Sequence, residues 1–96
     1  MRKTLPLLAA LLFTLVSSLS MACERPVPPE LPDPATAVTP QMVKAKNDVK
    51  AFVTAADAYL KCKISNKEHD AMVDEMHSVA DKFNKVVQEF KTRMAG

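Results

Sequence analysis

The residue types best suited to binding a metal ion lie close together in the second half of the chain. His69, Met72, Met76 and His77 supply imidazole and thioether groups, which are ligands that suit Cu(I). Met72 and Met76 also fall at the spacing of an apolar helix face, where methionine usually packs in a core. We therefore expect no metal site and no cofactor, and we retain copper binding as an alternative.

An acidic stripe follows the same segment, at steps of three and four residues: Asp70, Asp74, His77 and Asp81. This spacing places the four side chains along one side of a helix. Metal sites in helical bundles draw ligands from facing helices, and the preceding segment offers only Asp48 and Asp57. We interpret the stripe as a solvated charged face.

The motifs of common enzymes are missing from the sequence. The single glycine is the last residue, so there is no glycine-rich loop to bind phosphates. Ser78 adjoins His77 and would point elsewhere on a helix, which leaves no Ser-His-Asp arrangement. The chain is also short, at 96 residues, with little room for a catalytic cleft. We expect a protein that is not an enzyme.

The first 22 residues have the pattern of a cleaved signal peptide. Arg2 and Lys3 precede an apolar run over residues 5–16, and small residues follow at Ser20 and Ala22, as in secretory signals. The apolar run is shorter than the ~20 residues that span a bilayer. We expect cleavage after Ala22 and an exported protein, periplasmic or extracellular.

The charge of the predicted mature chain is balanced. The formal charge of +2 comes from Arg2 and Lys3, and residues 23–96 contain 11 basic and 11 acidic side chains. A neutral chain lacks the basic footprint that nucleic-acid binding requires. We therefore expect no nucleic-acid partner.

The two cysteines support two incompatible predictions. Export places them in an oxidising compartment, where they can pair. An extended segment at ~3.1 Å per residue is long enough to return along the first helix, so Cys23 can reach Cys62. Alternatively, Cys23 is the acylated first residue of a lipoprotein. The residues Ser20-Met21-Ala22 before it match the usual Leu-small-small pattern at Ala22 but not at Ser20.

A proline-rich arm is predicted over residues 23–38. Its five prolines exclude a helix and a central strand, and they favour an extended, semi-rigid chain. The segment Pro29-Glu30-Leu31-Pro32 has the P-x-x-P spacing of ligands for proline-recognising grooves. We interpret this segment as a spacer rather than such a ligand, and we expect the arm to fold back along the first helix as a third structural element, fastened by Cys23 and Cys62.

Two amphipathic helices are predicted after the arm, over about residues 40–63 and 66–93. The apolar seam of the first helix is Met42, Ala45, Val49, Phe52, Ala56 and Tyr59. The seam of the second is His69, Met72, Met76, Val79, Phe83, Val86 and Phe90. Alternating steps of three and four are typical of coiled coils. Thr39-Pro40 and the pair Ser65 and Glu68 are helix-start signals.

The short connection between the two helices predicts antiparallel neighbours. We therefore expect an all-α fold, a coiled-coil-like helical hairpin over residues 39–96, with Phe52 near Met76 and Val79. Apolar residues beside the seams widen the apolar stripe beyond what two helices cover. Val27 and Leu31 of the arm are candidates to cover the remainder.

Basic residues gather at the end of the predicted hairpin away from its turn: Lys44, Lys46, Lys50, Lys82, Lys85, Lys91 and Arg93. Such an end can contact an anionic surface, such as lipid head groups or a cell-wall polymer. Alternatively, carboxylates of the arm or of an antiparallel second copy can neutralise the positive charge of this end. The sequence thus predicts a structural or interaction module, secreted or in the cell envelope, that self-associates or binds an envelope protein.

Overall fold

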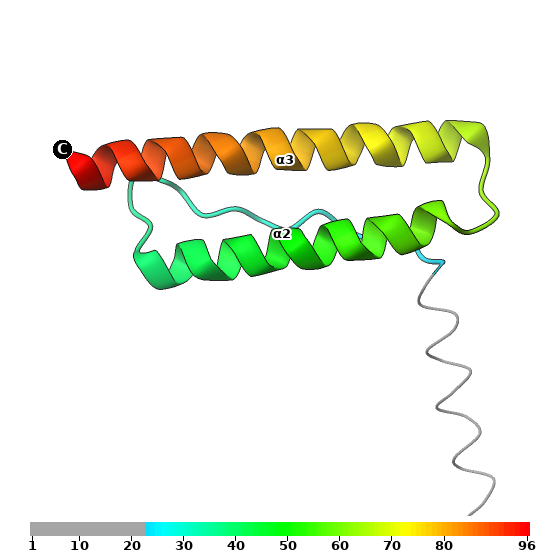
Figure 1. The fold of residues 1–96 in the computed structure, drawn as a ribbon, viewed down its shortest axis with the longest axis horizontal. Helices are drawn as coiled ribbons and strands as arrows, with labels where there is room; N and C mark the ends of the chain where they lie inside the picture. Colours follow the sequence, from blue (N-terminus) through cyan, green and yellow to red (C-terminus); the bar gives the residue numbers. More distant parts are fainter. Residues whose placement is uncertain (1–22) are drawn as a thin grey trace, which may run out of the picture.

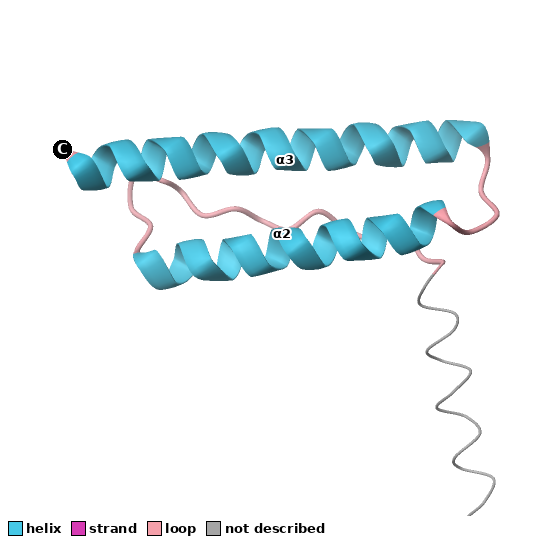
Figure 2. Cartoon of the chain, in the orientation of Figure 1, coloured by secondary structure: helices cyan, strands magenta, loops and turns pink. Residues whose placement is uncertain are grey.

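Two helices form an antiparallel hairpin in a computed structural model that describes residues 23–96. Helix α2 covers Thr39–Leu60 and helix α3 covers Asn66–Ala95, and the two lie side by side (Figure 1). Within the described residues there is no strand (Figure 2). The predicted all-helical hairpin is confirmed for this part of the chain. The predicted signal peptide, residues 1–22, lies outside the described residues.

The arm, residues 23–38, runs along the hairpin without helix or strand. It starts beside the loop that joins the helices, which we call the turn end. It then passes the two helices and enters α2 at the opposite, free end (Figure 1). Leu31 packs against the core, and Arg25 forms an ion pair with Glu75 of α3 at 3.4 Å. The arm is therefore a third packed element.

Helix α2 starts and ends differently from the prediction. Val38, not Thr39, is the N-cap, and its backbone N–H donates to Oε1 of Gln41 at 2.9 Å. At the other end, the backbone N–H groups of Lys61 and Cys62 donate to carbonyls three residues back, so the last turn tightens. The helix ends at Leu60 rather than near residue 63, and the connection is correspondingly longer.

Helix α3 begins at the capping box that the sequence predicts. The Ser65 hydroxyl accepts from the Glu68 backbone N–H at 3.1 Å, and the Glu68 carboxylate accepts from the Ser65 backbone N–H at 3.1 Å. The backbone hydrogen bond, followed by the hydrogen bond from the Ser65 hydroxyl, lowers the pKa of Glu68. The helix extends past the expected residue 93 to Ala95, because no glycine or proline interrupts it before Gly96.

Replacing Ser65 with alanine should lower the free energy of unfolding by about 1 kcal/mol, the usual value of a helix cap. The effect should depend on pH. Because the folded pKa of Glu68 is lowered, its stabilisation is present above the ordinary glutamate pKa and is lost as the pH falls through the folded pKa. Urea unfolding at pH 7 and pH 3 measures this. A pH-independent difference between the two proteins would contradict it.

The core lies between the helices and the arm, toward the turn end. Its buried residues are Val49, Phe52, Ala56, Tyr59, Met72 and Val79, with Met76 packed against them. The predicted proximity of Phe52 to Met76 and Val79 is confirmed. Val27, however, is 83% exposed, so its expected role as a cover is wrong and Leu31 alone packs on this core. Val27 is flanked by prolines, which hold the chain extended there.

Arg93 fastens the arm to the free end of α3. Its guanidinium donates from Nε to the Pro34 carbonyl at 2.9 Å and from Nη2 to the Ala37 carbonyl. Ala37 is 2% exposed, so this contact closes over the arm where it turns into α2. Two side-chain hydrogen bonds thus hold the arm against α3 at the free end.

Replacing Arg93 with alanine should lower the free energy of unfolding by about 1–2 kcal/mol, because two hydrogen bonds from a charged group are lost. The amides of Thr36 and Ala37, which donate to the Asp33 carbonyl, should exchange faster with deuterium. The exposed Lys85, replaced with alanine, is the control. Unchanged exchange at both amides would contradict the assignment of Arg93 as the clamp.

Candidate functional site

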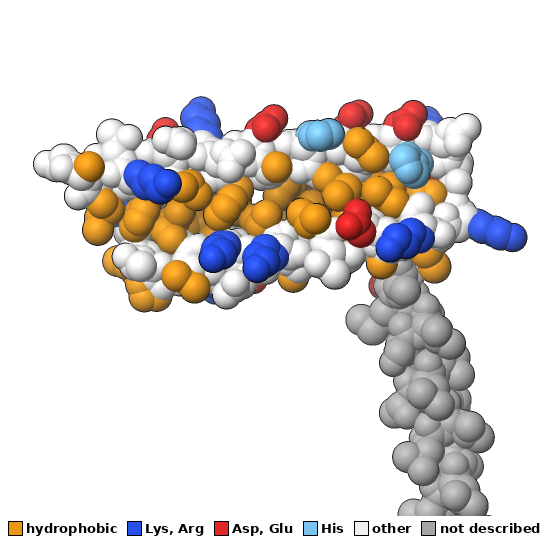
Figure 3. All heavy atoms as spheres, viewed as in Figure 1, with side chains coloured by type: hydrophobic (Ala, Val, Ile, Leu, Met, Phe, Trp, Pro, Cys, Tyr) orange, Lys and Arg blue, Asp and Glu red, His pale blue; other side chains and the backbone are white. Residues whose placement is uncertain are grey.

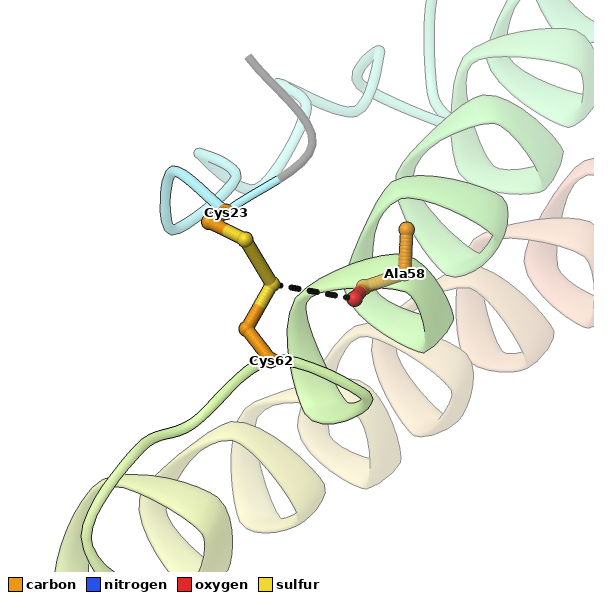
Figure 4. Close-up of a disulfide and its surroundings, with 3 residues drawn as sticks. All are labelled: Cys23, Ala58 and Cys62. Atoms are coloured by element: carbon orange, nitrogen blue, oxygen red, sulfur yellow. Dashed lines mark hydrogen bonds between the residues drawn. A yellow bond between two sulfur atoms is a disulfide. The ribbon is translucent and has the colours of Figure 1, made fainter. Parts of the chain in front are cut away.

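The predicted cysteine pair is present as a disulfide. Cys23 and Cys62 are bonded, with their Cα atoms 5.8 Å apart, and Sγ of Cys62 also lies 3.5 Å from the Ala58 carbonyl (Figure 4). The bond ties the start of the arm to the end of α2, as the length of the arm predicts. A lipid anchor needs the same Cys23 sulfur, so the two predictions exclude one another.

The candidate soft-metal ligands differ in exposure. Met72 is fully buried at 0% exposure and Met76 packs against the core, whereas His69 and His77 are exposed. Within residues 23–96, no three His, Cys, Asp or Glu side chains converge on a common point. Asp70 lies 3.7 Å from Nδ1 of His69. The methionines therefore serve packing in this fold.

The basic residues of the free end divide into separate groups. Lys44 is paired with Asp48 at 2.6 Å, and Arg93 holds the arm. Lys82 and Lys91 are nine residues apart, which puts them about 180° apart around α3 at 3.6 residues per turn. The free end is therefore not one basic patch, and only part of the predicted set can act together.

Lys46 of α2 and Lys91 of α3 both border one apolar groove at the free end. The groove has a volume of about 250 Å³ and is lined by Thr39, Met42, Val43, Lys46, Phe83, Val87, Phe90 and Lys91. Met42, Phe83, Val87 and Phe90 are half-buried, and Val43 is 53% exposed. We call this feature the open groove. Apolar atoms form a band between the two helices, with basic side chains along it (Figure 3).

The open groove lies on the side of the hairpin that the arm leaves uncovered. Lys44 borders a hollow beside Glu30 and Leu31 of the arm, and Lys46 is about 200° away around α2. Leu31 packs against the core from the arm side, whereas every residue that lines the open groove belongs to α2 or α3. The apolar side chains that line the open groove are therefore only half-buried, although their spacing along the helices is that of core residues.

The apolar spacing predicts most of the side chains that line the open groove, but not the groove itself. Met42, Phe83 and Phe90 were predicted as seam residues, and Val43 and Val87 lie beside the seam. The spacing of apolar residues along the two helices does not indicate on which side of the hairpin the arm packs. Once that side is known, the positions of Lys44 and Lys46 on opposite sides of α2 indicate which of the two lysines faces the arm and which faces the open groove.

Comparison with protein-family models, with curated proteins and with solved structures found no match to this chain. Neither α2 nor α3 is long and apolar enough to cross a membrane.

Proposed function

We propose that this protein is a small exported interaction module without enzymatic activity, which binds its partner through the open groove. The observation that supports the proposal is the half-buried apolar floor made by Met42, Phe83, Val87 and Phe90. A hairpin of this size gains stability by covering such side chains. The arm covers one side of the hairpin and leaves this one for a partner.

The remaining chemistry of the described residues fits a binding role. Both cysteines are in the disulfide, and His69 and His77 are exposed on the surface of α3. Neither histidine lines the open groove or either of the two cavities beside the arm. The alternative for its location is attachment to a membrane as a lipoprotein with an acylated Cys23, which would replace the disulfide.

A photoreactive amino acid placed at the groove edge tests the proposal in the cells that make the protein. Introduced at Val43, it should cross-link to the bound partner on illumination. The exposed Ser78, which lies elsewhere on α3, is the matched control position. Val43 cross-links no stronger than those from Ser78 would contradict the open groove as the binding surface. The mass of the adduct distinguishes a second copy, another envelope protein and a lipid.

A further inference from the structure

We infer that the open groove binds an anionic single-chain amphiphile of the fatty-acid class, with the alkyl chain on the apolar floor and the carboxylate at the border of the groove, attracted by Lys46 and Lys91. This inference rests on the proposed function and names its ligand. It differs from a general affinity for anionic surfaces, because it places one head group and one chain at named residues.

The floor of the groove suits an alkyl chain. Phe83, Val87 and Phe90 of α3 face Met42 and Val43 of α2 across the groove, and all five side chains are partly accessible. Apolar area removed from water stabilises a complex roughly in proportion to that area. Methionine and aromatic side chains also adapt to a chain without fixed shape.

The rims of the groove suit an anionic head group. Lys46 and Lys91 belong to different helices and border the same floor. No Asp or Glu of the described chain lines the groove, and neither lysine forms an ion pair within residues 23–96. Lys44, by contrast, is neutralised by Asp48 at 2.6 Å. These two unpaired ammonium groups give the border of the groove a positive charge, which attracts an anionic head group.

The shape of the groove favours a single chain over a membrane surface. The groove is a local feature of about 250 Å³ between the two helices, which is room for one chain and not a face as wide as a bilayer. The hairpin already holds one extended, narrow chain on its other side, where the arm inserts Leu31. An alkyl chain in the open groove would cover apolar side chains on the open side, as Leu31 of the arm does on the other side.

Titration of the oxidised, exported protein with dodecanoate tests the inference by NMR. Dodecyltrimethylammonium, which has the same chain and the opposite charge, is the matched ligand control. We expect saturable shifts of the methyl signals of Met42, Val43 and Val87 with dodecanoate, and unchanged signals of Ile64 near the turn end. The cationic amphiphile should bind at least tenfold more weakly.

The double variant Lys46→Gln/Lys91→Gln should bind dodecanoate about tenfold more weakly, as expected for two partly exposed ion pairs. The variant Lys82→Gln/Lys85→Gln removes the same charge elsewhere on the free end and should bind like the original protein. Equal affinity for the two amphiphiles, or equal affinity of the two variants, would overturn the inference. Absence of saturable shifts would overturn it as well.

Failure of this inference can be separated from failure of the proposed function. Val43 cross-links to a protein, to a second copy or to phosphatidylglycerol vesicles, without dodecanoate binding, would overturn the fatty-acid assignment and leave the groove as a binding surface. Absence of both Val43 cross-links and dodecanoate binding would overturn both proposals. Dodecanoate binding that protects Val43 from cross-linking supports both.

Discussion

Replacing Cys62 with serine should lower the free energy of unfolding by about 4 kcal/mol, the value expected for closing a loop of this length in the unfolded chain. Cys23 and Cys62 are separated by 39 residues in sequence, and the loop between them contains the arm and all of α2. Without the bond, the start of the arm is no longer tied to the hairpin, and the packing of Leu31 on the core weakens with it.

Urea unfolding followed by circular dichroism measures this loss. Cys23→Ser should be destabilised as much as Cys62→Ser, and the original protein under strong reductant should match both. Reduction should not destabilise the double variant Cys23→Ser/Cys62→Ser further. Unfolding midpoints that do not differ between oxidised and reduced protein would show that the disulfide does not stabilise this fold.

Replacing Met72 with alanine should lower the free energy of unfolding by about 3 kcal/mol, the middle of the range for truncating a large buried side chain. Met72 is the largest side chain that is fully buried among the described residues. It packs in one cluster with Phe52, Ala56 and Tyr59 of α2. Its removal leaves a cavity that a core shared by two helices and an arm can refill only in part.

Met94 provides the matched control for this substitution, since it is a methionine of the same helix with 60% exposure. Met94→Ala should change the free energy of unfolding by less than about 0.5 kcal/mol. Equal effects of the two substitutions would contradict the position of the core at the turn end. The same measurement on Met72→Leu, which keeps the volume, should recover most of the stability.

The sequence was sufficient to predict the elements and the cysteine pair. The alternating apolar steps along α2 and α3 carry the helical period, and Ser65 with Glu68 marks the start of α3 by a hydrogen-bonding pattern that is local. The expected oxidising compartment and the length of the arm, which can bring Cys23 back to Cys62, predicted the disulfide, with an acylated Cys23 as the alternative. Each of these inferences depends on residues near one another or on the reach of the chain.

Features set by three-dimensional packing were not predictable from spacing. The arm can lie on either side of an antiparallel hairpin. The side on which it packs determines that Leu31 contacts the core while Val27 is exposed. The same choice separates Lys44, beside the arm, from Lys46, in the open groove. The candidate site therefore emerged from the path of the arm.

The intact mass of the native protein, measured without reductant, is the decisive test of an exported hairpin with a disulfide-bonded arm. We predict the mass of residues 23–96 less two hydrogen atoms, which reports cleavage after Ala22 and the bond between Cys23 and Cys62 together. Treatment with reductant should then restore those two hydrogens. A mass increased by acyl groups, a mass with both thiols reduced, or a chain that still carries residues 1–22 would contradict an exported hairpin whose arm is fixed by a disulfide.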